Sequence, residues 1–323
     1  MLPISRFFSI QPAPRVTPYR ILILLCPLMA TAAALLAPFG IGLPWALDLM
    51  THWVWPGLLY SLLFSLVGSW KERLLSIGSA AVCLILVASA IPSSDSLLKE
   101  GVTLKLASIN VLSSNTDYAA FDHWLASSQP DVVSVLEVSR GWEQALNKQT
   151  RYPFKHIIAG DDNFGIALLS RYPFVVVPPD TRKGPVEPTS ISVVVSAPSA
   201  APFQVTAVHP PPPLTPTLAS LHASQLAYLG GKTARYQGAA FLLGDFNATP
   251  WSSASWMLSQ LGLTRMSGTH PTWPAKWLPV ELLPLDVIVS NRHAKLISVK
   301  VGTAIGSDHR PIEATVLVPL AAH

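Results

Sequence analysis

The sequence has few charged residues. Only 12% of its 323 residues are Asp, Glu, Lys or Arg, and its mean hydropathy is +0.40. Soluble globular domains carry about 25% charged residues. The shortage argues against an ordinary soluble protein and predicts that part of the chain lies in lipid.

Cysteine is also scarce. The two cysteines, Cys26 and Cys83, both lie in apolar runs of the N-terminal third. Their positions exclude a disulfide framework or a cysteine-based zinc site in the more polar remainder of the chain. That remainder, of roughly 220 residues, is long enough to be stable through burial of its core alone.

Neither sign of charge dominates the polar remainder. Residues 101–323 contain 16 basic and 14 acidic side chains, although the pI of the whole chain is about 9.1. Proteins that bind polynucleotides usually present a strongly basic surface. The near balance makes nucleic acid a less favoured partner, while one local basic patch stays possible.

Three runs without a charged residue occupy the N-terminal third, at residues 21–47, 53–70 and 74–94. Each is close to the roughly 20 residues that a helix needs to cross a bilayer. Indole rings favour the headgroup layer at the ends of such helices. The tryptophans near the ends of these runs are Trp45, Trp53, Trp55 and Trp70. The pattern predicts a three-helix transmembrane region over residues 21–92.

A cleaved signal peptide is the alternative reading of the first run. Arg15 and Arg20 precede it, and the small residues from Ala30 to Ala34 resemble a cleavage sequence. Two further apolar runs follow directly, so we favour membrane helices over a signal peptide.

The positive charges predict the orientation of the helices. They precede the first run and separate the second from the third, whereas the loop between the first and second runs has none. Lys and Arg concentrate in cytoplasmic loops. Residues 1–20 are therefore expected to form a cytoplasmic tail of a multi-pass protein of the plasma (inner) membrane, with the C-terminal domain periplasmic or extracellular. A linker over residues 93–103 reaches at most about 35 Å and keeps this domain near the bilayer.

Past residue 104 the apolar runs shorten to the length of strands, and several helical patterns lie between them. The expected helices are Tyr118–Ser128, Leu218–Tyr236 and Ser252–Gln260. The expected strands are Leu104–Ile109, Val132–Leu136, Ile166–Leu169, Ile191–Val195, Phe203–Val208, Ala239–Leu243, Val287–Val289 and Thr315–Val318. Together they predict a mixed α/β domain over residues 104–323.

Polar side chains stand at the ends of several of these strands. Asn110, Glu137 and His209 each follow an apolar run, and Asp245 and Asn247 follow another. Strand ends converge readily on one rim of a sheet, where binding sites are common. Each residue alone is more typical of a turn or a surface, but their number favours a common site.

The residue types suit hydrolysis of a phosphate ester, which needs a hard cation and an oriented water. Mg²⁺ prefers oxygen ligands and keeps several waters, so one or two carboxylates suffice. Glu137 is the leading expected ligand, with Asn110 and Asp308 beside it.

The remaining side chains suit proton transfer and binding of phosphate oxygens. Asp245 could activate the attacking water, and Asn247, two residues on, could bind a phosphoryl oxygen. His209 and His309 could donate to the phosphate, and Asp286 could fix the tautomer of one imidazole.

The motifs resemble the endonuclease/exonuclease/phosphatase superfamily over about residues 104–318. They are Asn110 after a strand, Glu137 after Asp-Val-Val-Ser-Val-Leu, the segment Gly165–Arg171, His209, Gly-Asp-Phe-Asn at 244–247, Asp286 and Ser-Asp-His at 307–309. The resemblance implies a four-layered α/β sandwich that uses Mg²⁺ or Mn²⁺ to cleave phosphodiesters or phosphomonoesters. It implies the same roles for these residues, and adds Asn163 as a substrate-binding residue.

The sequence departs from the nuclease members of that superfamily. They often have Gly after the first-strand Asn and a Thr-Lys or similar pair after the Glu, whereas Val111 follows Asn110 and Val138 follows Glu137. Three membrane runs before such a domain resemble a bacterial subgroup associated with glycopeptide resistance and prenyl-pyrophosphate hydrolysis. This resemblance implies a lipid-linked phosphate or pyrophosphate substrate.

Four tryptophans are candidates for contact with the apolar part of such a lipid, or for ordinary packing. They are Trp251, Trp256, Trp273 and Trp277. Two other functions stay open at this point: an extracytoplasmic nuclease or phosphodiesterase, and a non-catalytic membrane-bound interaction or resistance factor.

Overall fold

The computed structural model describes residues 44–66, 69–92, 98–179, 190–276 and 280–322, with residues 32, 35, 36 and 278. Most of the first predicted membrane run, part of the linker at 93–103, and Trp277 lie outside the described residues.

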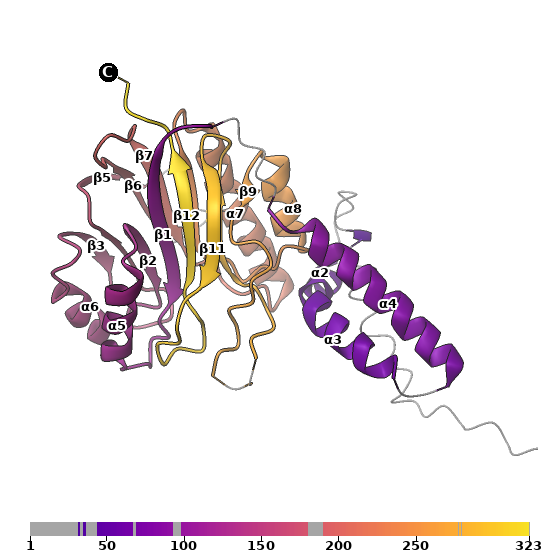
Figure 1. The fold of residues 1–323 in the computed structure, drawn as a ribbon. Coiled ribbons are helices and arrows are strands. Elements are labelled where there is room, and N and C mark those ends of the chain that lie inside the picture. Colours follow the sequence, from indigo (N-terminus) through magenta and orange to yellow (C-terminus); the bar gives the residue numbers. More distant parts are fainter. Residues whose placement is uncertain are drawn as a thin grey trace, which may run out of the picture.

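Two six-stranded sheets form the centre of the C-terminal domain (Figure 1). The first contains, in spatial order, β11 (Lys295–Val301), β12 (Ile312–Val318), β1 (Val102–Asn110), β2 (Val132–Leu136), β4 (Ile166–Ser170) and β3 (Phe154–Ile158). The second contains β5 (Phe174–Val177), β6 (Ser190–Val195), β7 (Phe203–Val208), β8 (Ala240–Asp245), β10 (Asp286–Ser290) and β9 (Thr264–Arg265). The pairs β1 with β2 and β7 with β8 are parallel, and the other described pairs are antiparallel.

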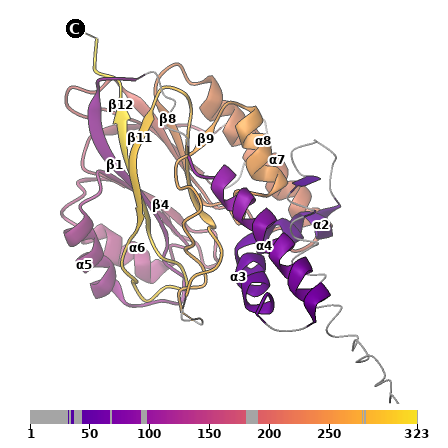
Figure 2. The same cartoon turned by 45° about the vertical axis from the view of Figure 1, so that its right-hand side comes forward.

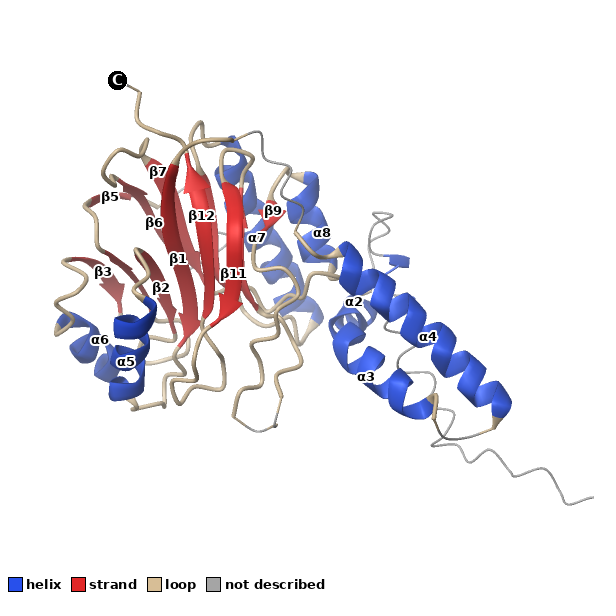
Figure 3. Ribbon diagram, viewed as in Figure 1, coloured by secondary structure: helices blue, strands red, loops and turns tan. Residues whose placement is uncertain are grey.

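The two sheets pack face to face and carry helices on their outer faces (Figure 3). Alternate residues of a strand point to opposite faces, so in β1 Leu104 and Leu106 enter the core between the sheets, while Ala107 and Ile109 face a second core. The helices of this second core are α5 (Tyr118–Ser128) and α6 (Arg140–Asn147), and those on the other sheet are α7 (Pro216–Arg235) and α8 (Ser253–Gln260). The expected mixed α/β sandwich of four layers is confirmed.

A helical unit precedes the sandwich and projects from it (Figure 2). It consists of α2 (Trp45–Met50), a 3-10 turn η2 (Thr51–Trp53), α3 (Val54–Phe64) and α4 (Trp70–Ser89). Helices α3 and α4 pack against each other through residues that include Val54, Leu58 and Cys83. We call the segment from residue 45 to residue 92 the N-terminal hairpin.

One described helix is long and apolar enough to cross a membrane, and it is α4, with 20 residues. Helix α3 has only 11 residues, so it is shorter than the predicted second run. The three-helix transmembrane region therefore stays a prediction.

Candidate functional site

The order of the strands brings the predicted side chains to one rim of the sandwich. In the parallel pair β1 and β2, Asn110 lies opposite Leu136, the residue before Glu137. In the parallel pair β7 and β8, Val208 lies opposite Gly244, so His209 and Asp245 leave the sheet side by side. Asp286 begins β10 and lies opposite Asp245 in the antiparallel register.

Asn110 connects the carboxylates of the two sheets. Its Nδ2 atom donates to Glu137 Oε1 at 2.9 Å and to Asp245 Oδ2 at 3.3 Å, while its Oδ1 atom accepts from the backbone of Leu112 at 3.0 Å. The second oxygen of Glu137 accepts from the backbone N–H of Ser113 at 3.2 Å. The amide thus fixes two carboxylates that repel each other.

Two imidazoles approach one oxygen of Asp245. The Nε2 atoms of His209 and His309 lie 3.6 and 3.5 Å from its Oδ2 atom. On the other side of each ring, His209 Nδ1 is 3.1 Å from the carbonyl of Asn163, and His309 Nδ1 is 2.8 Å from Asp286 Oδ2. Asp286 therefore lies against one imidazole, as its predicted role requires, while the predicted donation of the two histidines to a phosphate stays a prediction.

His309 carries the proton that it shares with Asp286. Burial lowers the pKa of the imidazole, but Asp286 and Asp245 outweigh burial and raise the pKa to about 10. Burial acts on Asp286 in the opposite sense and raises the pKa of its carboxyl. We assign the positive charge to His309, because carboxylates face both of its ring nitrogens.

Two site residues have left-handed backbone, which is rare outside glycine. Glu137 has a φ of 59° and Asn247 a φ of 47°. The backbone N–H of Asn247 donates to Asp245 Oδ1 at 2.9 Å, and its side chain donates to the carbonyl of Pro210 at 3.1 Å. These bonds stabilise the turn and leave Oδ2 of Asp245 facing the imidazoles.

Asp308 joins the same rim through the turn that carries it. The hydroxyl of Ser307 donates to the carbonyl of Asn110 at 2.7 Å, and the indole N–H of Trp273 donates to Asp308 Oδ2 at 3.2 Å. The sequence suggested only that Trp273 could contact lipid or pack in a loop, and gave no signal that its indole would bind a predicted metal ligand.

Asn163 lies at the edge of the site, and its side chain contacts a residue that the sequence did not single out. Ser113 Oγ donates to Asn163 Oδ1 at 2.6 Å. The ring of Phe164 lies beside that of His209, with centroids 5.8 Å apart. Neither Ser113 nor Phe164 belongs to a motif, so only the fold identifies them as neighbours of the site.

The site combines more negative than positive charge. Glu137, Asp245, Asp286 and Asp308 are 8%, 2%, 0% and 8% exposed, and no Lys or Arg among the described residues forms an ion pair with any of them. Buried charges require a compensating partner. The excess of buried carboxylates fits a divalent cation.

The arrangement limits which side chains could hold this cation. No three or more His, Cys, Asp or Glu of the described chain are grouped as direct ligands of one ion, and the amide oxygen of Asn110 accepts from Leu112. Glu137 and Asp308 offer the carboxylate oxygens that fit Mg²⁺, an ion that keeps several of its waters.

The comparisons with known proteins agree with this geometry. The model of the endonuclease/exonuclease/phosphatase family matches residues 107–309. A search of curated proteins found no match. An endonuclease/exonuclease/phosphatase of Beutenbergia cavernae superposes with a TM-score of 0.54 and 19% identity, covering 67% of this chain and 72% of that one.

Two structures with bound nucleic acid are also similar in fold. D. rerio TDP2 complexed with single-strand DNA product has a TM-score of 0.53 and 17% identity, over 66% of this chain and 98% of that one. The 3′ phosphatase NExo from Neisseria, bound to product DNA hairpin, has a TM-score of 0.50 and 20% identity, over 65% and 98%. At these identities the likeness shows the fold alone.

Proposed function

Because the chain belongs to the endonuclease/exonuclease/phosphatase family, we propose that it is a membrane-anchored phosphoesterase that uses Mg²⁺ or Mn²⁺ and acts outside the cytoplasm. The observation that carries the hydrolytic part is the placement of Asp245. Its Oδ2 atom accepts from Asn110, which also binds Glu137, and two imidazole Nε2 atoms face it.

The residues divide the work of hydrolysis between them. Asp245 accepts a proton from the attacking water, and the imidazole of His309 faces its carboxylate. Asn247 and His209 bind phosphoryl oxygens and orient the ester. His309, held by Asp286, opposes the negative charge that develops on the phosphoryl group. A cation bound by Glu137 and Asp308 would supply further neutralisation of that charge.

The position of the N-terminal hairpin supports a catalytic domain outside the cytoplasm. The loop that the charge pattern predicts to be external contains Asp48, which accepts hydrogen bonds from Ser253 of the sandwich. The end of α4 near Leu86 also contacts the sandwich, whereas Lys71 and Arg73 lie near the start of this helix, roughly 20 Å away along its axis. Both predicted external segments thus contact the catalytic domain.

A lipid-linked phosphate or pyrophosphate is the substrate that we propose. A site attached to the membrane meets lipid head groups at high effective concentration. The guanidinium groups of two arginines near the site donate to other parts of the protein. Arg310 donates to Glu281 and to a backbone carbonyl, and Arg265 donates to three backbone carbonyls. They are poorly placed to bind the backbone of a polynucleotide.

The tryptophans give partial support to a lipid substrate. Trp273 binds Asp308, so its indole stands beside the site. Trp251 is buried against the N-terminal hairpin, and Trp256 lines a cavity there. Only Trp273, among the described members of this set, is placed to contact a substrate at Asp308.

Turnover by the full-length chain in lipid nanodiscs tests the proposal. Release of phosphate from a prenyl pyrophosphate and from phosphatidic acid is compared with cleavage of single-stranded DNA, each with Mg²⁺ and with EDTA. We expect Mg²⁺-dependent turnover of a lipid phosphate. DNA cleavage without lipid turnover would favour the nuclease alternative, which the two DNA-bound neighbours make worth including. If Glu137→Ala and His309→Ala variants kept the full effect of the wild-type chain in cells, the non-catalytic alternative would be favoured.

A further inference from the structure

We call residues 245–249, which include Asp245 and Asn247, the catalytic turn. Side chains of the N-terminal hairpin bind the last residue of this turn and the first residue of α8. His52 Nδ1 lies 3.1 Å from Thr249 Oγ1, and both groups are buried. Asp48 Oδ1 accepts from the backbone N–H of Ser253 at 2.9 Å and from its hydroxyl at 2.7 Å. Thr249 is only four residues past Asp245 in the sequence.

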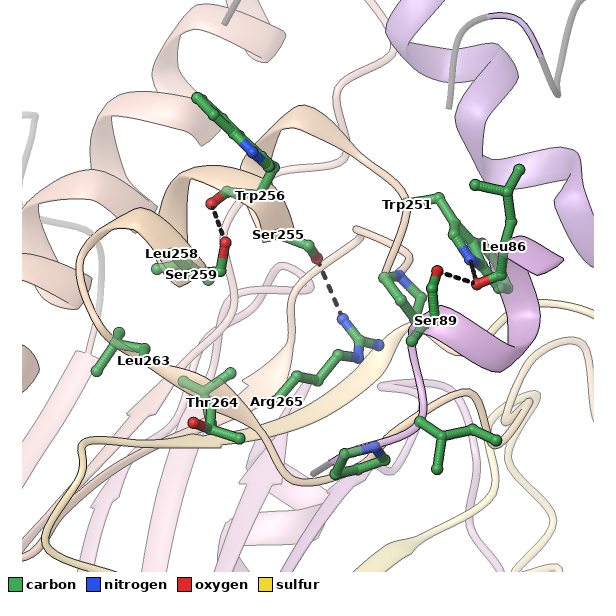
Figure 4. A pocket seen from close by; sticks show the side chains of 15 residues that line it. Leu86, Ser89, Trp251, Ser255, Trp256, Leu258, Ser259, Leu263, Thr264 and Arg265 are labelled. Carbon is green, nitrogen blue, oxygen red and sulfur yellow. Dashed lines mark hydrogen bonds between the residues drawn. The ribbon is translucent and has the colours of Figure 1, made fainter. Parts of the chain in front are cut away.

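Tryptophan side chains connect the same two parts of the chain. Trp251 donates its indole N–H to the carbonyl of Leu86 at 2.9 Å, an interaction that Figure 4 shows beside the cavity at the end of α4. Trp55 donates to the carbonyl of Thr269 at 3.1 Å. The ring of Trp251 also packs in the apolar cluster of the hairpin, which includes Val54 and Val87.

Two of these bonds involve backbone groups at helix ends. The first N–H groups of a helix have no partner within the helix and carry partial positive charge. Asp48 accepts the N–H of Ser253, the first residue of α8. The last carbonyls of a helix are similarly open, and Leu86 lies in the final turn of α4. Separating the two parts would leave the N–H of Ser253 without its carboxylate and would remove one of two donors from the carbonyl of Leu86, which also accepts from the Ser89 hydroxyl at 2.9 Å.

The catalytic turn depends on such external bonds because its backbone is strained at Asn247. On one side, His222 of α7 lies 2.7 Å from the carbonyl of Phe246. From another side, Arg265 donates to the carbonyl of Ala248 at 3.2 Å. From a third side, the imidazole of His52 contacts the hydroxyl of Thr249 at 3.1 Å. The hairpin therefore supplies one of the supports that hold the turn between Asp245 and Thr249.

We infer that Asp48 and His52 are positioning residues of the active site, so that the N-terminal hairpin forms part of the catalytic unit as well as an anchor. They act by holding the turn that carries Asp245 and Asn247. A carboxylate displaced by about 1 Å from its reactive position can lower a rate by about 100-fold. The kinetic part of this inference rests on the hydrolytic activity proposed above.

The kinetic test compares variants of the full-length chain in nanodiscs, with the phosphate ester that the wild-type protein hydrolyses. His52→Ala and Asp48→Asn are expected to lower kcat on the order of 10- to 100-fold and to change KM by less than about threefold. His52→Asn keeps a polar group near the position of Nδ1 and is expected to restore most of kcat. Asp122→Asn is the matched control, because Asp122 on α5 accepts similar bonds from Gln149 and Arg151.

A second measurement is independent of turnover. Hydrogen exchange of peptides covering residues 245–255 is expected to quicken in His52→Ala and in Thr249→Val, but not in Asp122→Asn. The double variant His52→Ala/Thr249→Val should exchange no faster than the quicker single variant, since both remove the same bond.

The outcomes separate this inference from the proposed function. Unchanged kcat in both hairpin variants of an active enzyme overturns the inference and leaves the function intact. If the wild-type chain hydrolyses no ester, the proposed function fails, and hydrogen exchange alone decides whether the hairpin holds the turn. Exchange that is equally fast in wild type and His52→Ala also overturns the inference.

Discussion

The Nε2 atom of His309 lies 3.5 Å from Oδ2 of Asp245. The same oxygen faces the imidazole of His209 and accepts from the side-chain amide of Asn110, which belongs to the other sheet. Asp245 is thus the side chain on which both sheets and both imidazoles converge, and the variants below test its neighbours one at a time.

Asp245→Asn removes the proposed acceptor of the proton while keeping nearly the same volume. We expect kcat to fall by about 1,000-fold, since an amide cannot accept the proton of the attacking water. Initial rates with a saturating phosphate ester measure the loss, and circular dichroism checks the fold. Activity within tenfold of the wild type would show that another group activates the water.

Glu137→Gln removes a negative charge from the proposed cation site. The concentration of Mg²⁺ that gives half-maximal rate should rise by on the order of tenfold or more, as measured by titrating MgCl₂ into the metal-free protein. Glu143→Gln is the control, because Glu143 pairs with Arg140 on the outer helix α6. An equal response of both variants would contradict the assignment of Glu137.

Asp286→Ala leaves the positive charge of His309 buried without its closest partner. Breaking one side of a buried pair costs about 3–5 kcal/mol. Denaturant unfolding should show a loss of this order, and Asp286→Ala/His309→Leu should lose less than the sum of the two single variants. Additive losses would mean that the two side chains do not interact.

The stability of the protein should fall as the pH drops below 6.5. Burial lowers the pKa of His52 to about 4, opposed by Asp48 and assisted by His222 and Arg265. Since the unfolded chain binds a proton at higher pH than the folded one, His52 stabilises the fold fully above pH 6.5 and loses this contribution as the pH falls toward 4. The slope is about 1.4 kcal/mol per pH unit over that window.

Unfolding free energies at several pH values between 4 and 7.5 measure this dependence. The wild-type curve should fall more steeply with acid than the curve of His52→Asn, which has no titrating ring. Parallel curves would show that the ring of His52 is protonated equally in both states.

Gly165→Ala should destabilise the sheet beside Glu137. A Cβ atom at this position would collide with the backbone carbonyl of Val138 and approach the N–H of Gly160 at 2.7 Å. Neither backbone group can move without breaking the bonds of Val138 with Gly165 and Gly160. We expect the free energy of unfolding, measured with denaturant, to fall by more than about 2 kcal/mol. Gly262→Ala is the control: its Cβ position has open space around it, so this variant measures only the cost of replacing a glycine with left-handed backbone.

Strands buried on both faces were predictable from the sequence because their apolar runs are continuous. The bounds expected for β2 and β7 are those observed, as are those of α5. The sequence did not predict the edge strands β5 and β11. None of their side chains is fully buried, so their sequences resemble loops. Helix α6 was also missed, because only Trp142 and Leu146 of its eight residues are buried.

The motifs indicated which residues belong to the site, but the contacts between them required the fold. Asn110 and Asp245 are 135 residues apart in the sequence, and only the packing of the two sheets brings them together. The pairing of Trp273 with Asp308 depends in the same way on a loop that has no regular pattern. Asp48 and His52 were plain loop residues between apolar runs until the structure placed them beside Thr249 and Ser253.

The bonds of the N-terminal hairpin to the sandwich would fix the orientation of the catalytic domain relative to the proposed membrane anchor. A domain on a slack linker would sweep through a range of heights and tilts above the bilayer. The bonds of Asp48, His52 and Trp251 would instead hold the catalytic domain rigidly against the N-terminal hairpin. The rim of the sandwich that carries the site would then keep one height above the bilayer and one angle relative to α4. The distance of a phosphorus atom from the bilayer plane would then select substrates before any contact within the site does.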